Sequence, residues 1–410
     1  MSISLNLNKT YQYLLVILAF LMPLTVFGAN LIIVIICLIW LFSGNYRSKF
    51  NQIIDSKLMI ASIVFYGIHV LGLLWTEDMS WGLHILHKMW YFLLLFPILF
   101  TIVKKEYIRY YVIAFIASIT LTEILSYMVW FEIIPPFRAA TVANPTPFMS
   151  HISYNPILAF SIYIVSHEFF FNKRLSKFNF WLYSFLMVTM SINMFITGGR
   201  AGQVAFFTML TILIFQFFNA QKVKSLFVTI VFIPLIFFTA YQTSDLFQNR
   251  VDAAVKNTIS YSDNKFTPIG LRITFARNSW QIIKENPLIG AGTGDFPSEY
   301  IRVDKMYPSS QPVTTNPHNM YILILVELGL IGLISMLSIF YYQIKLSFKS
   351  QNRFIRNAGI TLPLLFLVVM WSDSYILGHF TTLMFVFFLS LIHISEPTRL
   401  LSISYAVFCL

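Results

Sequence analysis

The chain has 410 residues, of which 57% are hydrophobic, 17% aromatic and only 11% charged, and its mean hydropathy is +0.72. This composition excludes a soluble globular domain, whose surface needs more polar residues, and it predicts a polytopic membrane protein. The formal net charge of +11 does not indicate nucleic-acid binding, because the basic residues are spread over short connections between apolar runs.

Twelve apolar runs approach the length that crosses a bilayer, roughly 20 residues each. We therefore expect an all-α polytopic fold of about 12 transmembrane helices with a large outer loop that carries short amphipathic helices. Nine helices occupy residues 1–241, the loop spans 242–317, and three helices occupy 318–394. The first run is followed at once by another, so it predicts a membrane helix and not a removed signal. The expected helices lie near 11–28, 30–43, 58–75, 84–103, 108–130, 153–171, 180–197, 201–218, 223–241, 318–343, 357–372 and 376–394.

The distribution of lysine and arginine predicts which face of the membrane each loop occupies. With the N-terminus inside, 17 of the 28 basic residues fall on the inner side and three on the outer side. The other eight lie in the 242–317 loop. Because short inner loops are enriched in positive charge, this asymmetry places the long loop outside. The three outer cations are Lys88, Arg138 and Arg200.

A glycine-flanked arginine joins the seventh and eighth expected helices, where residues 197–202 read Thr-Gly-Gly-Arg-Ala-Gly. Glycines let the backbone or a ligand approach closely, and they supply unusual backbone angles. A tight turn needs these glycines, but it does not need Arg200. A cation at the outer edge of the hydrocarbon region indicates a functional site. The alternative is an arginine that extends to the lipid headgroups.

The outer loop contains a predicted amphipathic helix with an arginine in its first turn. The preceding polar stretch, 243–268, is expected to be irregular, and apolar residues then recur at helical spacing over 270–286. Arg272 lies in the first turn, where a cation is mildly unfavourable. An anionic ligand bound by the guanidinium and the N-terminal N–H groups would explain this position. Arg277 lies elsewhere around the helix, and we expect it to be solvated.

Residues 290–294 read Gly-Ala-Gly-Thr-Gly, which is the glycine spacing of some nucleotide-binding loops. No predicted strand precedes this segment and no helix opens from it, so we interpret it as a turn and loop packed on the helix bundle. The sequence has no metal-ligand spacing and no Walker or Rossmann pattern in its required setting. A nucleotide-driven pump is therefore not expected.

The loop returns to the membrane through residues 315–319, which read Thr-Asn-Pro-His-Asn. A proline just before an apolar run fits a helix N-terminus, so we expect His318 on a rigid helix end at the water boundary. An imidazole there can act as a general base near neutral pH; the alternative is a histidine that only anchors the helix. Asp373, in the turn between the last two expected helices, is the first candidate to orient it. Asp295 and Glu299 are weaker candidates for that role.

These motifs occur in one order and share one expected face. They are Gly-Gly-Arg-Ala-Gly at 198–202, Gly-Leu-Arg at 270–272, Asn-Pro-Leu-Ile-Gly-Ala-Gly at 286–292 and Asn-Pro-His-Asn at 316–319. With about twelve helices, they resemble the O-antigen ligase family, which is related to O-antigen polymerases and O-linked oligosaccharyltransferases. The motif match covers about residues 185–340. Each motif is short, so their order and spacing carry the resemblance.

The resemblance implies a multi-pass glycosyltransferase of the bacterial inner membrane, with its loop and active site in the periplasm. Such an enzyme moves a completed glycan from undecaprenyl diphosphate to a sugar hydroxyl of the lipid A core, among membrane lipids and without nucleic acid, metal or other cofactor. It implies His318 as the base, Arg200 and Arg272 as the diphosphate clamp, and Asp373 in support. Further substrate-binding candidates are Arg277, Asn316 and Asn319.

Two alternatives stay open at this point. An O-antigen polymerase or a protein O-oligosaccharyltransferase would use the same donor. A transporter of lipid-linked glycan would instead place charged groups near the membrane midplane. The expected helices hold few charges, with Glu123 and Glu327 as exceptions, and the notable cations lie at the outer rim. That distribution favours catalysis at one face.

The end of the sequence, 392–410, resembles a translated sequencing adapter, and we interpret it as a non-native tail. Cys409 lies in this tail and Cys37 lies within an apolar run, so no disulfide between them is expected. Independent sequencing of the locus checks the interpretation. A reading frame that continues unchanged through Leu410 contradicts it.

Overall fold

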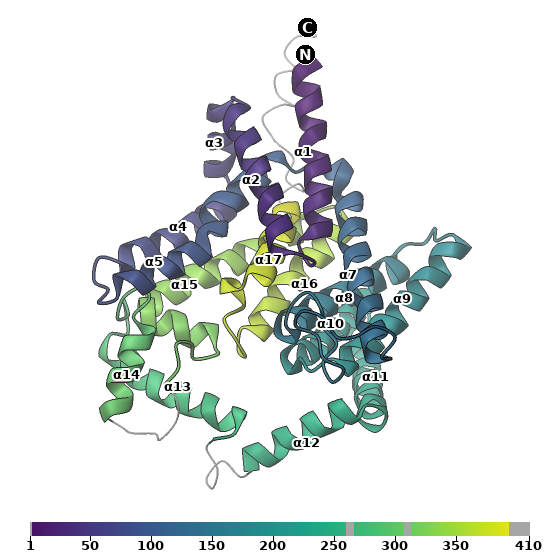
Figure 1. Cartoon of the computed structure of the whole chain (residues 1–410). Helices are drawn as coiled ribbons and strands as arrows, with labels where there is room; N and C mark the ends of the chain where they lie inside the picture. The colour runs from purple at the N-terminus through teal and green to yellow at the C-terminus, as the bar shows by residue number, and fades with distance from the viewer. Residues whose placement is uncertain (1, 260–265, 307–312, 393–410) are drawn as a thin grey trace.

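The computed structural model describes residues 2–259, 266–306 and 313–392, which form helices and a single isolated bridge between Thr141 and Asn144. The expectation of an all-helical fold is confirmed for these residues (Figure 1). The interpreted tail, apart from Ile392, lies outside them. The helices are α1 (Ser2–Leu21), α2 (Val26–Phe42), α3 (Tyr46–Asp55), α4 (Lys57–Gly72), α5 (Met79–Trp90), η1 (Tyr91–Leu95), α6 (Phe96–Ile102), η2 (Lys105–Tyr107), α7 (Ile108–Trp130), α8 (His151–Phe171), α9 (Lys177–Ile196), α10 (Arg200–Phe218), α11 (Lys222–Thr243), α12 (Asp245–Ile259), α13 (Pro268–Glu285), α14 (Phe296–Met306), α15 (Met320–Lys349), α16 (Arg353–Val369), η3 (Tyr375–Leu377) and α17 (His379–Ile392).

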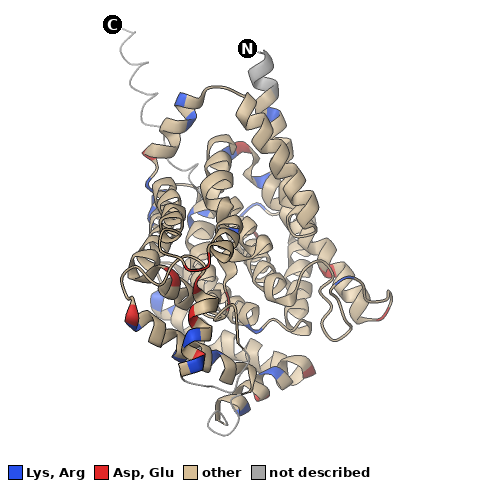
Figure 2. Cartoon of the chain, turned by 60° about the vertical axis from the view of Figure 1, so that its left-hand side comes forward, with Lys and Arg blue, Asp and Glu red and all other residues tan. Residues whose placement is uncertain are grey.

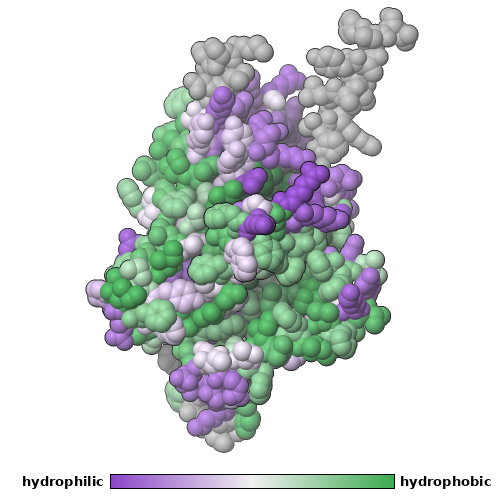
Figure 3. All heavy atoms as spheres, turned by 90° about the vertical axis from the view of Figure 1, so that its right-hand side faces the viewer, coloured by the Kyte–Doolittle hydropathy of each residue, from purple (hydrophilic) through white to green (hydrophobic). Residues whose placement is uncertain are grey.

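Six helical stretches in the described residues are long and apolar enough to cross a membrane. They coincide with six of the expected helices, and α2 with α3, bent by 115°, would add a seventh if the pair forms one span. Hydrophobic side chains cover most of the middle of the face in Figure 3. The expected total of twelve and the orientation stay predictions. The six stretches are Met79–Ile102, Lys105–Trp130, Lys177–Ile196, Arg200–Phe218, Lys222–Thr243 and Met320–Lys349.

The closest helix packing in the bundle lies directly below the glycine-flanked arginine. Helix α10 packs along α8, and a Cβ added to Gly202 would lie 2.2 Å from the Cβ of Asn155. Any larger residue at 202 would therefore force the two helices apart, because tightly packed interiors leave no room for an extra carbon. Gly202 therefore sets how closely α10 packs against α8.

Helix α15 is broken at Gly329, and the Gly-Ala-Gly-Thr-Gly segment fills the break. Gly329 has φ +60° and ψ −157°, a conformation that is essentially restricted to glycine. The freed backbone groups bond to the segment 287–292: the Leu330 N–H donates to the Pro287 carbonyl at 2.9 Å, and the Gly292 N–H donates to the Glu327 carbonyl at 3.0 Å. Because buried backbone polar groups must be paired, the segment stabilises the kink. The structure confirms that this glycine-rich segment is a loop packed on the bundle, but the expectation that no helix opens from it is wrong, because α14 begins at Phe296, two residues after Gly294.

The described part of the 242–317 loop forms a layer of three helices, α12, α13 and α14, at the end of the molecule opposite the start of α1 (Figure 1). Charged residues of both signs gather on this layer (Figure 2). The expectation that 243–268 is irregular is wrong, because α12 occupies Asp245–Ile259. Ser244 accepts a hydrogen bond from the Phe247 N–H at 3.2 Å, and Phe247 is buried against Phe195 at a ring separation of 5.0 Å. This apolar anchor holds α12 on the bundle.

Replacing Gly329 with alanine should destabilise the protein. The new Cβ would lie 2.4 Å from the Leu288 carbonyl carbon, at a backbone conformation that costs a non-glycine residue on the order of 1–3 kcal/mol. Thermal unfolding in detergent should show a lower midpoint. Gly67→Ala is the matched control, because a Cβ there meets nothing within 4 Å. An equal midpoint for both variants would contradict the role assigned to the break.

Candidate active site

His318 lies just before α15 and not within its first turn. Asn319 is the N-cap, and its side-chain oxygen accepts the Ile322 N–H at 3.1 Å. The expected helix start at 318 is therefore two residues early, and Pro317 is not the first helical residue. His318 has φ +52°, which is uncommon for a residue with a Cβ. Asn316 holds this conformation, because its Oδ1 accepts the His318 N–H at 2.9 Å.

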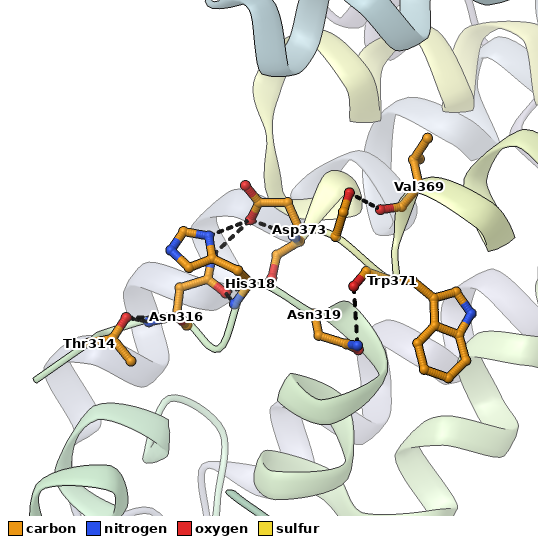
Figure 4. Close-up of polar contacts among 9 residues, drawn as sticks. Thr314, Asn316, His318, Asn319, Val369, Trp371 and Asp373 are labelled. Carbon is orange, nitrogen blue, oxygen red and sulfur yellow. Dashed lines mark hydrogen bonds and ion pairs between the residues drawn. The ribbon is translucent and has the colours of Figure 1, made fainter. Parts of the chain in front are cut away.

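Asp373 reaches His318 from the turn that follows α16 (Figure 4). The His318 Nδ1 and Asp373 Oδ1 atoms are 3.4 Å apart, which is long for a hydrogen bond but close enough for a small shift of the ring to form one. The same Oδ1 accepts the Ser374 N–H at 2.8 Å and the Asn316 Nδ2 at 3.2 Å. The carboxylate is thus fixed, and 40% of the imidazole side-chain surface stays exposed.

The surroundings of Asp373 favour its charged form. Burial acts to raise the pKa of this carboxyl, but the contact with His318, the Ser374 N–H and the positive charge of Arg272 outweigh burial and hold the pKa below its ordinary value of 3.8. Asp373 is therefore ionised at neutral pH. A fixed carboxylate beside an imidazole can orient the ring and stabilise its protonated form.

Two arginines from other helices lie within electrostatic range of Arg200. Arg200 is the first residue of α10, and the charges of Arg250 on α12 and Arg272 on α13 both act on it. The Nη2 atom of Arg250 lies 3.2 Å from the position that a Cβ on Gly198 would take, so its side chain lies over the glycine turn. Arg272 also acts on Asp373, so it is the arginine that connects Arg200 electrostatically with the His318–Asp373 pair.

No carboxylate neutralises these three cations among the described residues. The ion pairs found there are formed by Arg302, with Glu285 and Glu299, and by His318 with Asp373. The Nε atom of Arg200 is buried and has no hydrogen-bond partner. Three mutually repelling guanidinium groups with unused donors make a site for an anion.

The turn that carries Arg200 is held by side chains from α8 and from the loop that precedes α8. Asn144 Oδ1 accepts the Gly198 N–H at 3.1 Å, and the Asn144 amide lies 2.7 Å from His151 Nδ1. Thr197 donates its hydroxyl to Asn155 Oδ1 at 2.9 Å. The guanidinium of Arg200 therefore projects from a rigid support, as anion recognition requires.

The remaining candidates lie elsewhere. Asp295 is buried and accepts the Thr76 hydroxyl at 2.6 Å and the Glu77 N–H at 2.9 Å, and Glu299 pairs with Arg302 at 2.6 Å. Neither can orient His318, so that expectation is wrong for both. Arg277 is exposed, as expected from its place on the helix. Asn319 uses its amide within the protein, where Nδ2 donates to the Trp371 carbonyl at 3.3 Å.

Arg250 is the residue that sequence reasoning missed. The stretch around Arg250 was expected to be irregular, so the direction of its side chain could not be predicted. The apolar spacing of Phe247, Val251 and Val255 is that of a helix, and it was the available signal. A helix there puts Arg250 one position away from the anchored stripe, where it can reach the glycine turn.

An apolar groove of about 900 Å³ runs between α9 and α11 and ends beside the Arg200 turn. Phe195 and Ile196 line it from α9, and Leu235 and Ile236 line it from α11. Ile196 directly precedes the Thr197–Gly199 turn, so one end of the groove lies next to this turn, and none of the three arginines lines the groove. It has the shape and polarity that a hydrocarbon chain requires.

Replacing Asp373 with asparagine should remove a pH-dependent part of the stability. Since the folded pKa is below 3.8, the carboxylate stabilises the native state fully above that value, and the contribution disappears as the pH falls through the lower folded pKa. The thermal midpoint of the wild-type protein should therefore approach that of Asp373→Asn as the pH drops below 3.8. A difference between the two midpoints that is constant with pH would contradict this.

The comparisons with known proteins agree with the geometry. Residues 185–337 match the model of the O-antigen ligase family, a range that includes the three arginines and His318 but not Asp373. An uncharacterized protein of Haemophilus influenzae is 28% identical over 225 residues, which are 51% of this chain and 54% of that protein. The match thus spans about half the length of this relative. The apolar helices and the family indicate a multi-pass membrane protein. Residues 185–337 of this chain are thus similar to the O-antigen ligase family.

Proposed function

We propose that the protein is an O-antigen ligase. It transfers a preassembled glycan from undecaprenyl diphosphate to a sugar hydroxyl of the lipid A core, at the periplasmic face of the inner membrane and without metal or nucleotide. The observation that carries the proposal is that Arg250 and Arg272 act electrostatically on Arg200, that none of the three pairs with a carboxylate among the described residues, and that Arg272 also acts on Asp373, the partner of His318.

The arginines fit the leaving group of this reaction. Breaking the bond between the anomeric carbon and the diphosphate leaves additional negative charge on the phosphate oxygens. Guanidinium groups meet such oxygens through paired N–H bonds, and preformed donors at the site of developing charge are a large source of catalysis. Arg200, Arg250 and Arg272 supply three such groups from rigid helices. The energy of their mutual repulsion is recovered when the dianion binds.

His318 fits the role of the base. Its exposed imidazole removes the proton from the acceptor hydroxyl while the hydroxyl oxygen forms its bond to the anomeric carbon. Asp373 orients the ring and stabilises the imidazolium that results. Attack from the face opposite the diphosphate inverts the anomeric configuration. Proton, carbon–oxygen bond and leaving group are thus all assigned to groups on one rim.

The groove between α9 and α11 fits the lipid of the donor. An undecaprenyl chain is hydrocarbon, and burying it against apolar walls such as Phe195 and Leu235 is favourable at roughly 25 cal/mol per Å². With the chain in the groove, the diphosphate at its end lies next to the Arg200 turn. A transporter would instead need charged groups near the membrane midplane.

His318→Ala should abolish glycan transfer and leave protein level and membrane insertion unchanged, because the variant removes only the base. Transfer is measured with purified protein, lipid-linked glycan and rough lipopolysaccharide as the acceptor. Robust residual transfer would remove His318 from the base role.

Each arginine of the cluster should matter for the diphosphate donor. Alanine at 200, 250 or 272 should reduce kcat/KM for the donor by about 10²–10³, the usual effect of losing one donor to a developing oxyanion. Arg200→Lys should rescue only partly, because a lysine cannot make paired N–H bonds. Arg277→Ala is the matched control on α13, and it should stay near wild type. Full activity of any of the three cluster variants counts against its place in the clamp.

The lipopolysaccharide of a deletion strain separates the ligase from related activities with the same donor. A ligase predicts a gel pattern of bare core, with polymer accumulated on the lipid carrier. Core capped with a single repeat would indicate a polymerase. Normal lipopolysaccharide with an unmodified pilin would indicate a protein O-oligosaccharyltransferase.

A further inference from the structure

A second cavity, of about 380 Å³, opens beside Asp373 and contains none of the three arginines. It is bounded by α5, the start of α8, α15 and the turns at 315–316 and 373–378. This volume is typical of small-molecule sites, which span about 300–1,000 Å³. Its polar and aromatic walls include Trp81, Lys88, Asn316, Glu327, Asp373 and Tyr375.

Glu327 is the unusual member of this wall. Its side chain is 1% exposed, and neither carboxyl oxygen has a hydrogen-bond partner among the described residues. The Gly294 backbone amide approaches the carboxyl without forming a well-aligned bond. A buried carboxyl without partners costs free energy, so its position at a cavity calls for a ligand that supplies donors.

The charged and aromatic side chains of the cavity wall indicate which kind of ligand the cavity can bind. Two carboxyl groups, of Glu327 and Asp373, and a single ammonium group, of Lys88, face the cavity, so a diphosphate gains little there. Carboxylates accept hydrogen bonds from hydroxyl groups, and Trp81 offers an apolar ring face with one N–H donor. A polyhydroxylated ring has the donors and the apolar face that this wall requires.

We propose that this cavity binds the acceptor sugar, with Glu327 accepting hydrogen bonds from hydroxyl groups that do not react. This inference rests on the proposed transferase function and adds the site of its second substrate. Asp373 belongs both to the cavity wall and to the pair with His318, so a sugar held here lies next to the carboxylate that orients the base, although His318 itself does not line the cavity. Donor and acceptor then approach the base from separate sites: the diphosphate from the arginines, and the sugar from the cavity.

The test is a steady-state analysis in which donor and acceptor concentrations are varied separately. The acceptor is rough lipopolysaccharide, and the donor is undecaprenyl diphosphate-linked glycan. Glu327→Leu should raise the KM for the acceptor by roughly tenfold, because it removes buried hydrogen bonds to the sugar, and it should leave the KM for the donor within about twofold. Glu327→Gln should lie between, since its amide oxygen still accepts.

Two further variants distinguish a loss of acceptor binding from a loss of folding. Gln343→Leu is the matched control: Gln343 is fully buried on the same helix, its amide also lacks partners, and it lies outside the cavity. Its acceptor KM should equal that of wild type. Trp81→Ala, at a partly exposed position, should raise the acceptor KM even if Glu327→Leu fails to fold.

The outcomes separate this inference from the proposed function. If the wild-type protein transfers no glycan, the proposed function fails. If the wild type is active and the Glu327 and Trp81 variants keep the acceptor KM, or if they raise the KM values for donor and acceptor equally, the cavity is not the acceptor site and the transferase function stands.

Discussion

The repulsion that Arg250 and Arg272 exert on the guanidinium of Arg200 is the constraint on which the candidate site depends. Arg200, Arg250 and Arg272 come from separate helices and have no carboxylate among them in the described part of the chain. Cations at the edge of a bilayer would move apart if their supports were flexible. The packing around each of them prevents that movement.

The supports have one feature in common: each is an apolar contact or a hydrogen bond between uncharged groups, and none is an ion pair. The turn before Arg200 lies on Asn144 and Asn155, the anchor of α12 is Phe247, and α13 begins at a cap in which Thr267 accepts the Gly270 N–H at 3.1 Å. A carboxylate would hold the arginines more simply, but it would occupy the donors that an anion must use. Packing therefore holds the arginines in place without a neighbouring carboxylate, and the site keeps its positive charge.

The break in α15 helps to position the part of the site that contains His318 and Glu327. The segment 287–292 fills that break, and the same helix carries His318 just before its start and Glu327 two residues before Gly329. The ring of Phe275, on α13, lies 6.3 Å from the imidazole of His318 at an angle of 29°. The helix that carries Arg272 therefore also packs on the base, which couples the two functional groups through one element.

Much of the fold followed from local pattern, because apolar length and helical spacing are properties of a sequence window. The helices around 84–103, 180–197 and 201–218 were expected for that reason. The contacts that depend on tertiary structure were not available in the same way. Helix α12 is held by Phe247 against a distant ring, and Asp295 caps a segment more than 200 residues away. Arg250 was missed because its helix was missed.

The central claim is that the arginine cluster binds a diphosphate, not merely a lipid with a negative head. Titration of the purified protein in nanodiscs with undecaprenyl diphosphate and with undecaprenyl monophosphate tests this directly, because the two ligands share the same chain. The structure predicts that the diphosphate binds at least about tenfold tighter, and that the difference shrinks as salt screens the charges. Equal affinities for the two lipids at low salt would contradict it.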